Sequence, residues 1–513
     1  MLAQITSGAV LGVDAYLVRV EVDLANGLPC MHVVGLPENA VREGRERVTA
    51  ALSNAGFAVP PRRVTVNLAP ADIRKEGSAF DLPVALGMLA ANETISDRGL
   101  AATCVIGELG LDGTVRPVRG VLSIATRCKL DGVRALWCPT ANAAEACVVD
   151  DIEVLPVPSL QAVVDHLRGV QRLRPATRTM SPQPVPSPLH ELDFADVKGQ
   201  ETAKRALEIA AAGRHNVLMV GPPGSGKSML ARRVAGILPP LERSEAIEAT
   251  KVYSVAGALR AGQALIMARP FRAPHHTVSD AGLVGGGSPP RPGEASLAHT
   301  GVLFLDELPE FRRNALEALR QPLEDGRIVI GRARVALTYP ARIMLVAAMN
   351  PCPCGHFGTG SARCVCRPAQ VERYVGRVSG PLLDRIDLHI EVPSLAGERL
   401  TDERRGESSA VLRERVRSAR ERQLHRFGAA AGGRYNGEME PREMREHCRI
   451  DAVGERLLRA AVQRLGFSAR AYHRVLRVAR TIADLAGADR IAATHLAEAV
   501  QYRSLDRSRA RAG

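Results

Sequence analysis

The chain has 513 residues, of which 46% are hydrophobic and 24% are charged, so it has room for about three domains and is neither disordered nor a single small scaffold. Its formal net charge of +13 is uneven, because residues 1–170 carry 15 basic and 19 acidic side chains, whereas residues 401–513 carry 24 and 15. The N-terminal part is therefore a poor match for a polyanionic partner.

The sequence contains no expected membrane segment or secretory leader. No apolar run approaches the ~20 residues of a membrane-spanning helix. The first charged residue, Asp14, falls within a strand-like pattern rather than ahead of an apolar stretch. We therefore expect a cytoplasmic protein without a membrane partner. Its ten cysteines are then expected to be buried thiols or metal ligands rather than disulfides.

The first 168 residues have the pattern of an α/β domain. Strands are predicted at Tyr16–Val22 and Val64–Leu68, where apolar and polar residues alternate. Helices are predicted at Ala40–Ala55 and Phe80–Ala91, where apolar residues recur at helical spacing. After this domain, residues 169–190 contain five prolines and almost no core-forming residues, which predicts a linker.

Two further domains are predicted beyond the linker. Residues 191–400 are expected to form an α/β domain with a parallel sheet, since short apolar strands alternate with helices. Residues 401–513 show helical periodicity with Arg-rich outer faces and predict a helical domain. The strands expected in the central domain are Asn216–Val220, Val302–Leu305, Ile343–Ala348 and Asp387–Val392.

A phosphate-binding loop follows the first of these strands and opens a helix predicted to begin near Met229. Glycines in such a loop let successive backbone amides face phosphate oxygens, and the helix N-terminus adds its positive end. Lys227 is expected to bridge the β- and γ-phosphates, and Ser228 to ligate Mg²⁺. The loop, which matches G-x-x-x-x-G-K-S, consists of Gly221, Pro222, Pro223, Gly224, Ser225, Gly226, Lys227 and Ser228.

Asp306 and Glu307 stand at the end of the strand Val302–Leu305, where acidic side chains are costly unless they are used. Asp306 is expected to hold Mg²⁺ through its water shell, and Glu307 to polarise the water that attacks the γ-phosphate. The alternative is a strand that ends in ordinary solvated acids.

Two more polar residues lie at strand ends of the same domain. Asn350 follows Ile343–Ala348, where its amide could orient the attacking water. Arg385 precedes the strand Ile386–Val392 and could reach the γ-phosphate of a neighbouring subunit as an arginine finger. Polar residues are common at strand ends, so a surface salt bridge is the alternative for Arg385.

Four cysteines within fifteen residues, two in each of two C-x-C pairs, are too dense to be packing choices. Zn²⁺ takes four thiolates tetrahedrally, and intervening glycines allow the loop to curl back, so a structural zinc site near the nucleotide or the pore is expected. His356 could replace one thiolate, and a reduced loop without metal is the alternative. The four residues are Cys352, Cys354, Cys364 and Cys366.

In this order the P-loop, the Asp-Glu strand, the Asn strand and the late Arg resemble the AAA+ ATPases. The segment Arg269–His276, with Gly285–Gly287 and Pro292–Glu294, is similar to an insertion of the magnesium-chelatase-like branch. With Val34–Pro37 and Val66–Asp72, the whole chain resembles the ComM/YifB family of bacterial proteins. That resemblance implies a motor like the hexameric helicases, which drives branch migration of DNA in recombination and natural transformation.

The resemblance also implies roles for single residues. Asn350 falls on the sensor 1 position and Arg385 on the arginine finger. Arg470 falls on the sensor 2 position of the helical lid, although spacing alone does not separate it from Arg474 and Arg477. The segment from Val197 to Gln200 falls where AAA+ proteins hold the adenine base, which implies ATP as the nucleotide.

The N-terminal domain resembles the Lon protease fold but lacks its catalytic pair. A Lon-type enzyme needs a serine nucleophile and a lysine base. Here Ala79 falls at the nucleophile position, with Ser78 one residue early, and Leu122 falls at the lysine position. We therefore expect an inactive domain used for binding or assembly.

Residues 327–337 alternate on both sides of a Gly-containing turn, as in a β-hairpin. In ring helicases of this branch such a hairpin enters the pore, so Arg332 and Arg334 are expected to contact phosphates of single-stranded, duplex or branched DNA. A solvated arginine pair is the alternative. The competing functions for the whole chain are a magnesium-chelatase-like ATPase subunit, a chaperone-type remodelling ATPase and a Lon-like protease.

Overall fold

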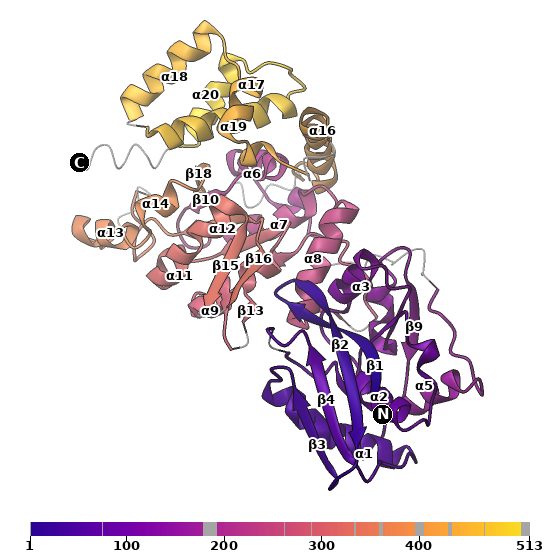
Figure 1. Ribbon diagram of the computed structural model, residues 1–513. Helices are drawn as coiled ribbons and strands as arrows, with labels where there is room; N and C mark the ends of the chain where they lie inside the picture. Colours follow the sequence, from indigo (N-terminus) through magenta and orange to yellow (C-terminus); the bar gives the residue numbers. More distant parts are fainter. Residues whose placement is uncertain are drawn as a thin grey trace. The chain divides into compact units, whose positions relative to one another are not determined.

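The computed structural model describes residues 2–73, 75–177, 192–260, 262–288, 290–332, 335–358, 363–394, 405–428, 433–465 and 467–503 (Figure 1). The chain forms two units, Met1–Gln183 with Ile247–Ile266, and Pro184–Ala246 with Met267–Gly513. Residues 247–266 thus belong to the first unit, although they lie in the stretch assigned from the sequence to the ATPase domain. Of the predicted linker 169–190, residues 178–190 lie outside the described residues.

The first unit is built on a seven-stranded mixed sheet. Its strand order is β3-β4-β2-β1-β5-β8-β9, in which β1 pairs antiparallel with β2 and β2 antiparallel with β4. The remaining neighbours are parallel. The strands are β1 (Leu2–Leu11), β2 (Asp14–Ala25), β3 (Cys30–Val34), β4 (Arg63–Ala69), β5 (Thr103–Val105), β8 (Ala135–Pro139) and β9 (Glu153–Val157).

Helices complete the α/β architecture of the first unit, as the sequence predicts. The predicted helices correspond to α1 (Asn39–Asn54) and α2 (Asp81–Ala91), and α3 (Val121–Leu130) and α5 (Leu160–Leu167) follow later in the chain. Alternate residues of β2 are fully buried, which is what its period-two pattern requires. They pack with residues of α2 in one hydrophobic core.

A five-stranded parallel sheet forms the centre of the second unit, in the order β11-β14-β17-β10-β18. All six residues of β17 are buried, as expected for a strand covered on both faces. Because the strands are parallel, their carboxyl ends meet at one edge of the sheet. The strands are β10 (Val217–Val220), β11 (Phe271–Arg272), β14 (Val302–Leu305), β17 (Met344–Met349) and β18 (Leu388–Glu391).

The helices α6 (Glu201–Gly213) and α7 (Lys227–Ile237) flank the first strand of this sheet, β10. Before β14 lie the short helix α9 (Asp280–Val284), the strand pair β12 (Gly285–Gly286) and β13 (Arg291–Pro292), and helix α10 (Glu294–Leu297). After β14 come helices α11 (Arg313–Ala318) and α12 (Arg320–Asp325).

The predicted hairpin is present directly after α12. Strand β15 (Arg327–Arg332) pairs antiparallel with β16 (Val335–Pro340), from Arg327 opposite Pro340 to Arg332 opposite Val335. Gly331 pairs with Ala336 within the ladder, so the glycine lies in the strand and not in the turn that we expected it to form. The two residues that join the strands lie outside the described residues.

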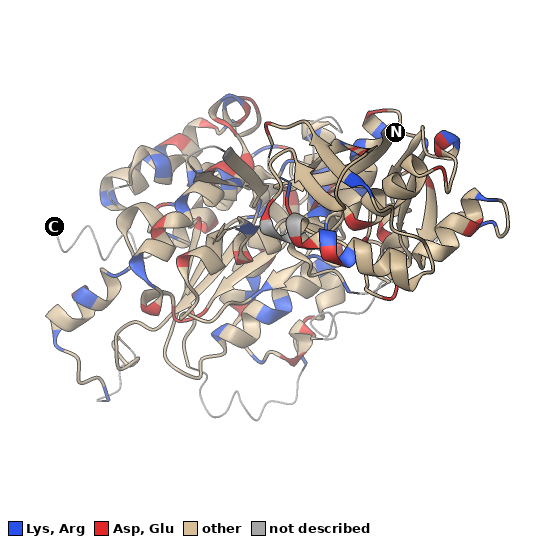
Figure 2. Cartoon of the chain, turned by 60° about the horizontal axis from the view of Figure 1, so that its bottom comes forward, with Lys and Arg blue, Asp and Glu red and all other residues tan. Residues whose placement is uncertain are grey.

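The described residues of the lid region, at the end of the chain, contain five α-helices, in keeping with the helical domain that the sequence predicts. They are α16 (Ser409–Phe427), α17 (Pro441–His447), α18 (Ala452–Leu465), α19 (Ala469–Leu485) and α20 (Ala493–Gln501). Helix α19 buries Val475, Val478 and Ile482 in the same core that contains Leu207 of α6. Basic and acidic residues occur together along these helices (Figure 2).

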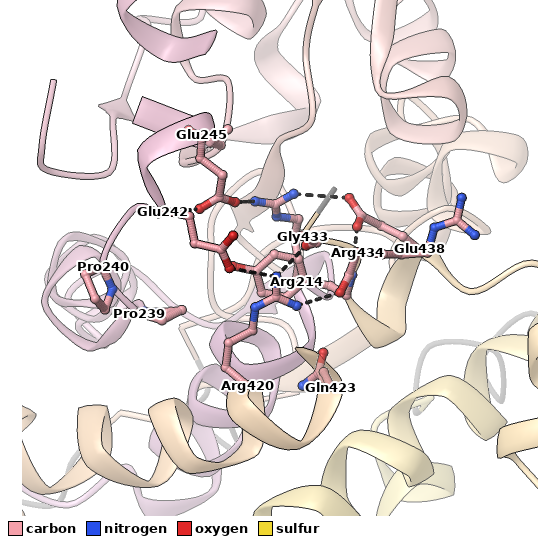
Figure 3. Close-up of polar contacts among 12 residues, drawn as sticks. Arg214, Pro239, Pro240, Glu242, Glu245, Arg420, Gln423, Gly433, Arg434 and Glu438 are labelled. Atoms are coloured by element: carbon pink, nitrogen blue, oxygen red, sulfur yellow. Dashed lines mark hydrogen bonds and ion pairs between the residues drawn. The ribbon is translucent and has the colours of Figure 1, made fainter. Parts of the chain in front are cut away.

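A buried ion network joins the lid region to the sheet region within the second unit (Figure 3). Arg214 donates to Glu245 at 3.2 Å and to Glu438 at 3.1 Å. The guanidinium groups of Arg214 and Arg420 both lie over the ring of Tyr435, at 4.2 and 3.7 Å from the ring centre. Each buried charge therefore has an opposite charge or an aromatic face beside it, as burial requires.

Candidate functional site

The predicted phosphate loop connects the end of β10 to the start of α7. Gly224 and Gly226 have φ angles of +75° and +91°, a left-handed conformation that favours glycine. At Gly221 an added Cβ would lie 2.1 Å from the carbonyl oxygen of Val392, so only glycine fits there. The helix begins at Lys227, two residues before the predicted start at Met229. Its N-terminus therefore faces the loop, as an anion-binding loop requires.

The side chain of Lys227 is buried at the centre of the loop. Its Nζ donates to the carbonyl oxygens of Gly221 at 2.7 Å and Pro222 at 2.9 Å, and to Oδ1 of Asn350 at 3.2 Å. Burial lowers the pKa of Lys227, and the nearby Asp306 carboxylate opposes that shift. The contact with Asn350 brings β17 and the P-loop together, as the sensor 1 prediction requires.

Ser228 and Asp306 are also in direct contact. The hydroxyl of Ser228 donates to Oδ2 of Asp306 at 2.5 Å, and the backbone N–H of Glu307 donates to Oδ1 of the same carboxylate at 3.0 Å. A hydroxyl and a carboxylate are hard oxygen ligands, which Mg²⁺ prefers. The two side chains predicted to bind magnesium thus meet where α7 begins and directly after β14 ends.

Glu307 adopts a left-handed backbone conformation, with φ of +53°. About half of its side chain is exposed, and its Oε2 lies 3.1 Å from Nδ1 of His276. The ring of His276 also lies 4.1 Å from that of His275 and edge-on to Phe311 at 6.4 Å. The sequence analysis assigned no role to His276, although the segment Arg269–His276 was the signal that could have directed attention to it.

The two residues predicted to lie near adenine occupy different environments. Val197 is buried in the hydrophobic core of the second unit. Gln200 has a left-handed φ of +60° and its Nε2 donates to the carbonyl oxygens of Pro393 at 2.8 Å and Ser225 at 3.3 Å. Gln200 therefore supports the backbone of the P-loop from the side of β18.

Arg385, the predicted arginine finger, is only 4% exposed. Its Nη1 donates to the carbonyl oxygen of Pro381 at 2.7 Å, and its Nη2 pairs with Glu324 on α12. The Nε atom is buried and has no hydrogen-bond partner. The guanidinium is thus held by α12 in the isolated chain.

The three sensor 2 candidates on α19 differ in their partners. Arg474 donates to Asp387 at 2.6 Å and to the carbonyl oxygen of Arg385 at 3.0 Å. Arg477 donates to the backbone carbonyls of Gly437 and Met439. Arg470 is exposed, and after the hydrogen bond from Arg385 it is one of the charges that lower the pKa of Glu324. Two candidates therefore have structural partners, which favours Arg470.

The four clustered cysteines come together as the zinc prediction requires. All four sulfur atoms lie within 4.8 Å of one another. The Sγ of Cys352 is 3.4 Å from that of Cys354 and 4.0 Å from that of Cys364. A tetrahedral site with Zn–S bonds of ~2.3 Å places its sulfurs about 3.8 Å apart. Backbone N–H groups, first that of His356, lower the pKa of Cys354 to about 6, which favours a thiolate ligand.

Of the two arginines predicted to contact DNA, one lies within the described residues. Arg332 is the last residue of β15, and Arg334 lies outside the described residues. At the base of the hairpin, Arg327 is exposed and is separated from the end of α12 by one residue.

The first unit does not assemble a Ser-Lys pair at the predicted position. Ser78 donates to Glu108, and Leu122 is fully buried on α3. The nearby Lys75 is buried, and its Nζ donates to the backbone carbonyls of Ile73, at 2.8 Å, and Pro70. Burial lowers the pKa of Lys75, but its amine faces carbonyl oxygens rather than a hydroxyl.

None of the helices in the described part of the chain combines the length and apolarity needed to cross a bilayer.

Three family models match the chain in succession. The model described as subunit ChlI of Mg-chelatase matches residues 20–142, that of magnesium chelatase, subunit ChlI, matches residues 193–400, and that of the ChlI C-terminal region matches residues 406–503.

Individual relatives match over the whole chain or over part of it. Competence protein ComM of Haemophilus influenzae is 48% identical over 509 residues, which cover 99% of this chain and 98% of that protein. The uncharacterized protein YifB of Salmonella typhimurium is 46% identical over 508 residues, with the same coverage. Lon protease 2 of Bacillus subtilis is 29% identical over 178 residues, 32% of this chain and 31% of that protein.

Proposed function

The chain belongs to the ComM/YifB family of magnesium-chelatase-like AAA+ ATPases, and from that premise we propose that it is an ATP-driven ring motor that moves DNA branch points. The observation that carries the proposal is the meeting of Lys227 with Asn350 and of Ser228 with Asp306 at one edge of the sheet. These contacts support the proposal because they bring a lysine, an asparagine amide and a hydroxyl–carboxylate pair together around the same loop.

In this proposal the P-loop binds the phosphates of ATP through its backbone amides and Lys227. The ammonium of Lys227, now bonded to two loop carbonyls, would exchange these partners for phosphate oxygens of higher charge. Ser228 and Asp306 would hold Mg²⁺, which neutralises charge on the β- and γ-phosphates when it is bound. Val197 and Gln200 would shape the side of the pocket nearest the base.

Glu307 would accept the proton of the attacking water, and Asn350 would orient that water. His276 lies 3.1 Å from Glu307 and can compete with water for the carboxylate. The distance suggests that His276 restrains Glu307 until the site closes. Closure would require a neighbouring subunit, whose Arg385 would neutralise charge on the transferred phosphate.

Assembly into a closed ring, most simply a hexamer, follows from a site that is completed in trans. Heterologous contacts between identical subunits generate rings when the rotation closes. Arg470, exposed at the start of α19, would add a second cation to the site as sensor 2. The first unit, without a catalytic pair, would serve binding or assembly.

DNA is the proposed polymer partner because one full-length relative is named a competence protein and the basic excess lies beyond the first domain. The hairpin β15–β16 would grip the phosphate backbone through Arg332 and Arg334, a contact that is independent of sequence and suits translocation. The four cysteines would bind one Zn²⁺ as a structural centre beside the nucleotide.

ATP hydrolysis and junction movement test the proposal together. The purified chain is incubated with ATP and Mg²⁺ in the presence of single-stranded, duplex or four-way-junction DNA, and phosphate release and movement of a labelled junction are followed. We expect DNA to stimulate hydrolysis and the junction to migrate only with hydrolysable ATP. Lys227→Ala is the matched inactive control. An active ATPase that ignores every DNA and never moves a junction would instead support a chelatase-like or chaperone-type ATPase.

A further inference from the structure

The loop that carries the four cysteines is linked to the nucleotide site in two ways, because it follows Asn350 in the chain and also contacts the P-loop. It begins two residues after Asn350, whose Oδ1 accepts a hydrogen bond from Lys227 at 3.2 Å. Cys352 is fully buried and accepts the backbone N–H of Phe357 at 3.3 Å. A change in the position of Cys352 would therefore be transmitted to Asn350 through one intervening residue.

A second contact leads directly to the P-loop. Gly355 is buried and has a left-handed φ of +85°, and its N–H donates to the carbonyl oxygen of Cys352 at 3.0 Å. A Cβ added at Gly355 would lie 2.4 Å from Cδ and 2.7 Å from Cγ of Pro223. The backbone of the cysteine loop is thus in close contact with the pyrrolidine ring of the P-loop.

Metal binding is well suited to hold this contact in place. Four thiol side chains without a metal gain little from lying within 4.8 Å of one another, whereas four thiolates around one Zn²⁺ are fixed by bonds of about 2.3 Å. Without the metal, a weak thiol contact of 3.7 Å would join Cys354 to Cys364 in place of bonds to a shared ion. Removing the metal should therefore release both Gly355 and the backbone that leads to Asn350.

We propose that the four cysteines form a zinc site that positions the P-loop, so that zinc occupancy controls the affinity for ATP. The proposal rests on the nucleotide site of the proposed function, but not on DNA or on the ring. Gly355 and Pro223 form the coupling contact, and Cys352 positions Asn350. Zinc acts as a structural element that contacts neither ATP nor the attacking water.

The test uses the full chain and measures zinc by elemental analysis and ATP by equilibrium binding in the presence of Mg²⁺. We expect about one zinc per chain. The double variant Cys364→Ser, Cys366→Ser should lose zinc and bind ATP on the order of tenfold more weakly. Cys30→Ser, which removes an exposed thiol outside the cluster, is the control and should retain both zinc and affinity.

A pair of glycine variants separates coupling from folding. Gly355→Ala should retain zinc yet lose affinity for ATP, because its Cβ displaces Pro223. Gly358→Ala introduces the same kind of backbone strain, at φ of +76°, but its Cβ meets nothing within 4 Å, so it should behave like the parent. Circular dichroism shows whether each variant is folded.

Three results would overturn the proposal. They are a parent that binds ATP fully without zinc, a cysteine variant that loses zinc but not affinity, and a Gly355→Ala protein that binds ATP as tightly as Gly358→Ala. Lys227→Ala should keep its zinc while losing ATP binding. A zinc-loaded parent that binds no ATP would refute the proposed function and with it the coupling, whereas failure to move DNA would leave both binding measurements intact.

Discussion

Arg385 and Glu324 form an ion pair in which the arginine is buried and the glutamate is about half exposed. Glu324 lies on α12, three residues before the start of the hairpin at Arg327. The hydrogen bond from Arg385 lowers the pKa of Glu324, so the carboxylate is charged at neutral pH. The residue that would complete a neighbour's site is therefore held by the segment that leads into the proposed DNA grip.

This pairing predicts that Glu324→Gln loosens the finger and raises basal ATP hydrolysis. A partly exposed ion pair contributes up to ~1 kcal/mol, so a rise of about threefold in the rate without DNA is expected, with a smaller stimulation by DNA. Glu317→Gln is the control. Glu317 lies on the preceding helix, α11, and its carboxylate pairs with Arg320 rather than with Arg385. Unchanged basal and stimulated rates would mean that the pair does not restrain Arg385.

Arg385→Ala should bind ATP normally but hydrolyse it on the order of a thousandfold more slowly in its own ring. The finger acts on the neighbouring subunit, so mixing this variant with Lys227→Ala should restore activity at interfaces that combine an intact P-loop with an intact finger. Steady-state phosphate release is measured across mixing ratios. Verified mixed rings without any recovery would exclude a role in trans.

Lys227→Ala and Glu307→Gln should fail at different steps. The first removes the cation bonded around the loop, so ATP binding is lost. The second keeps the shape of Glu307 but removes the base, so binding remains while turnover falls by about a hundredfold or more. Equilibrium binding and single-turnover hydrolysis separate the two effects. A Glu307→Gln protein with the parental rate would show that another group activates the water.

Arg474 and Arg470 lie on the same helix, but substitution by Met should affect a different property at each position: stability at Arg474 and ATP hydrolysis at Arg470. Arg474→Met leaves Asp387 buried without its closest cation and should lower the free energy of unfolding by ~3–5 kcal/mol. Arg470→Met, at an exposed position, should leave stability within about 0.5 kcal/mol of the parent but slow ATP hydrolysis if it is sensor 2. Chemical denaturation and phosphate release distinguish these outcomes.

The same site predicts a pH dependence of stability. Burial alone would raise the pKa of Asp387, but Arg474 and His215 outweigh it and hold the pKa below its usual 3.8. A depressed pKa stabilises the folded state above the unfolded value, and this stabilisation is lost as the pH falls from about 4 toward the folded pKa. Asp387→Asn should show a shallower loss of stability over that range than the parent. Parallel curves would remove Asp387 as the source.

The P-loop, Asp306 and Asn350 could be singled out from the sequence because all three follow apolar strands, whose carboxyl ends meet at one edge of a parallel sheet. Strand β14 matches its predicted bounds because a continuous buried strand ends where the first charged residue follows it. The four cysteines were equally predictable, because their density within fifteen residues has no packing explanation.

Other features depend on tertiary contacts that spacing does not encode. His276 reaches Glu307 from thirty-one residues away, and only the folded chain brings them within 3.1 Å. Arg474 and Arg470 are one turn apart and were indistinguishable until their partners were known. Gly331 was expected in the turn because glycine is common there, yet the register of the ladder places it opposite Ala336.

The last prediction concerns the grip on DNA. Arg332→Ala with Arg334→Ala should leave basal ATP hydrolysis nearly intact, weaken stimulation by DNA and abolish branch migration of a labelled junction, because hydrolysis drives movement only when the ring holds a polymer. Arg327→Ala removes an arginine at the opposite end of the same hairpin, where Arg327 pairs with Pro340, and should migrate junctions like the parent. Removing each phosphate-binding arginine should also reduce the salt dependence of DNA binding. The slope of the logarithm of the binding constant against the logarithm of the salt concentration should change by about one for each arginine. If the double variant moves junctions as fast as the parent, the hairpin is not the grip. If Arg327→Ala is equally defective, the whole hairpin rather than its tip would carry the contact, and the assignment of Arg332 and Arg334 would fall.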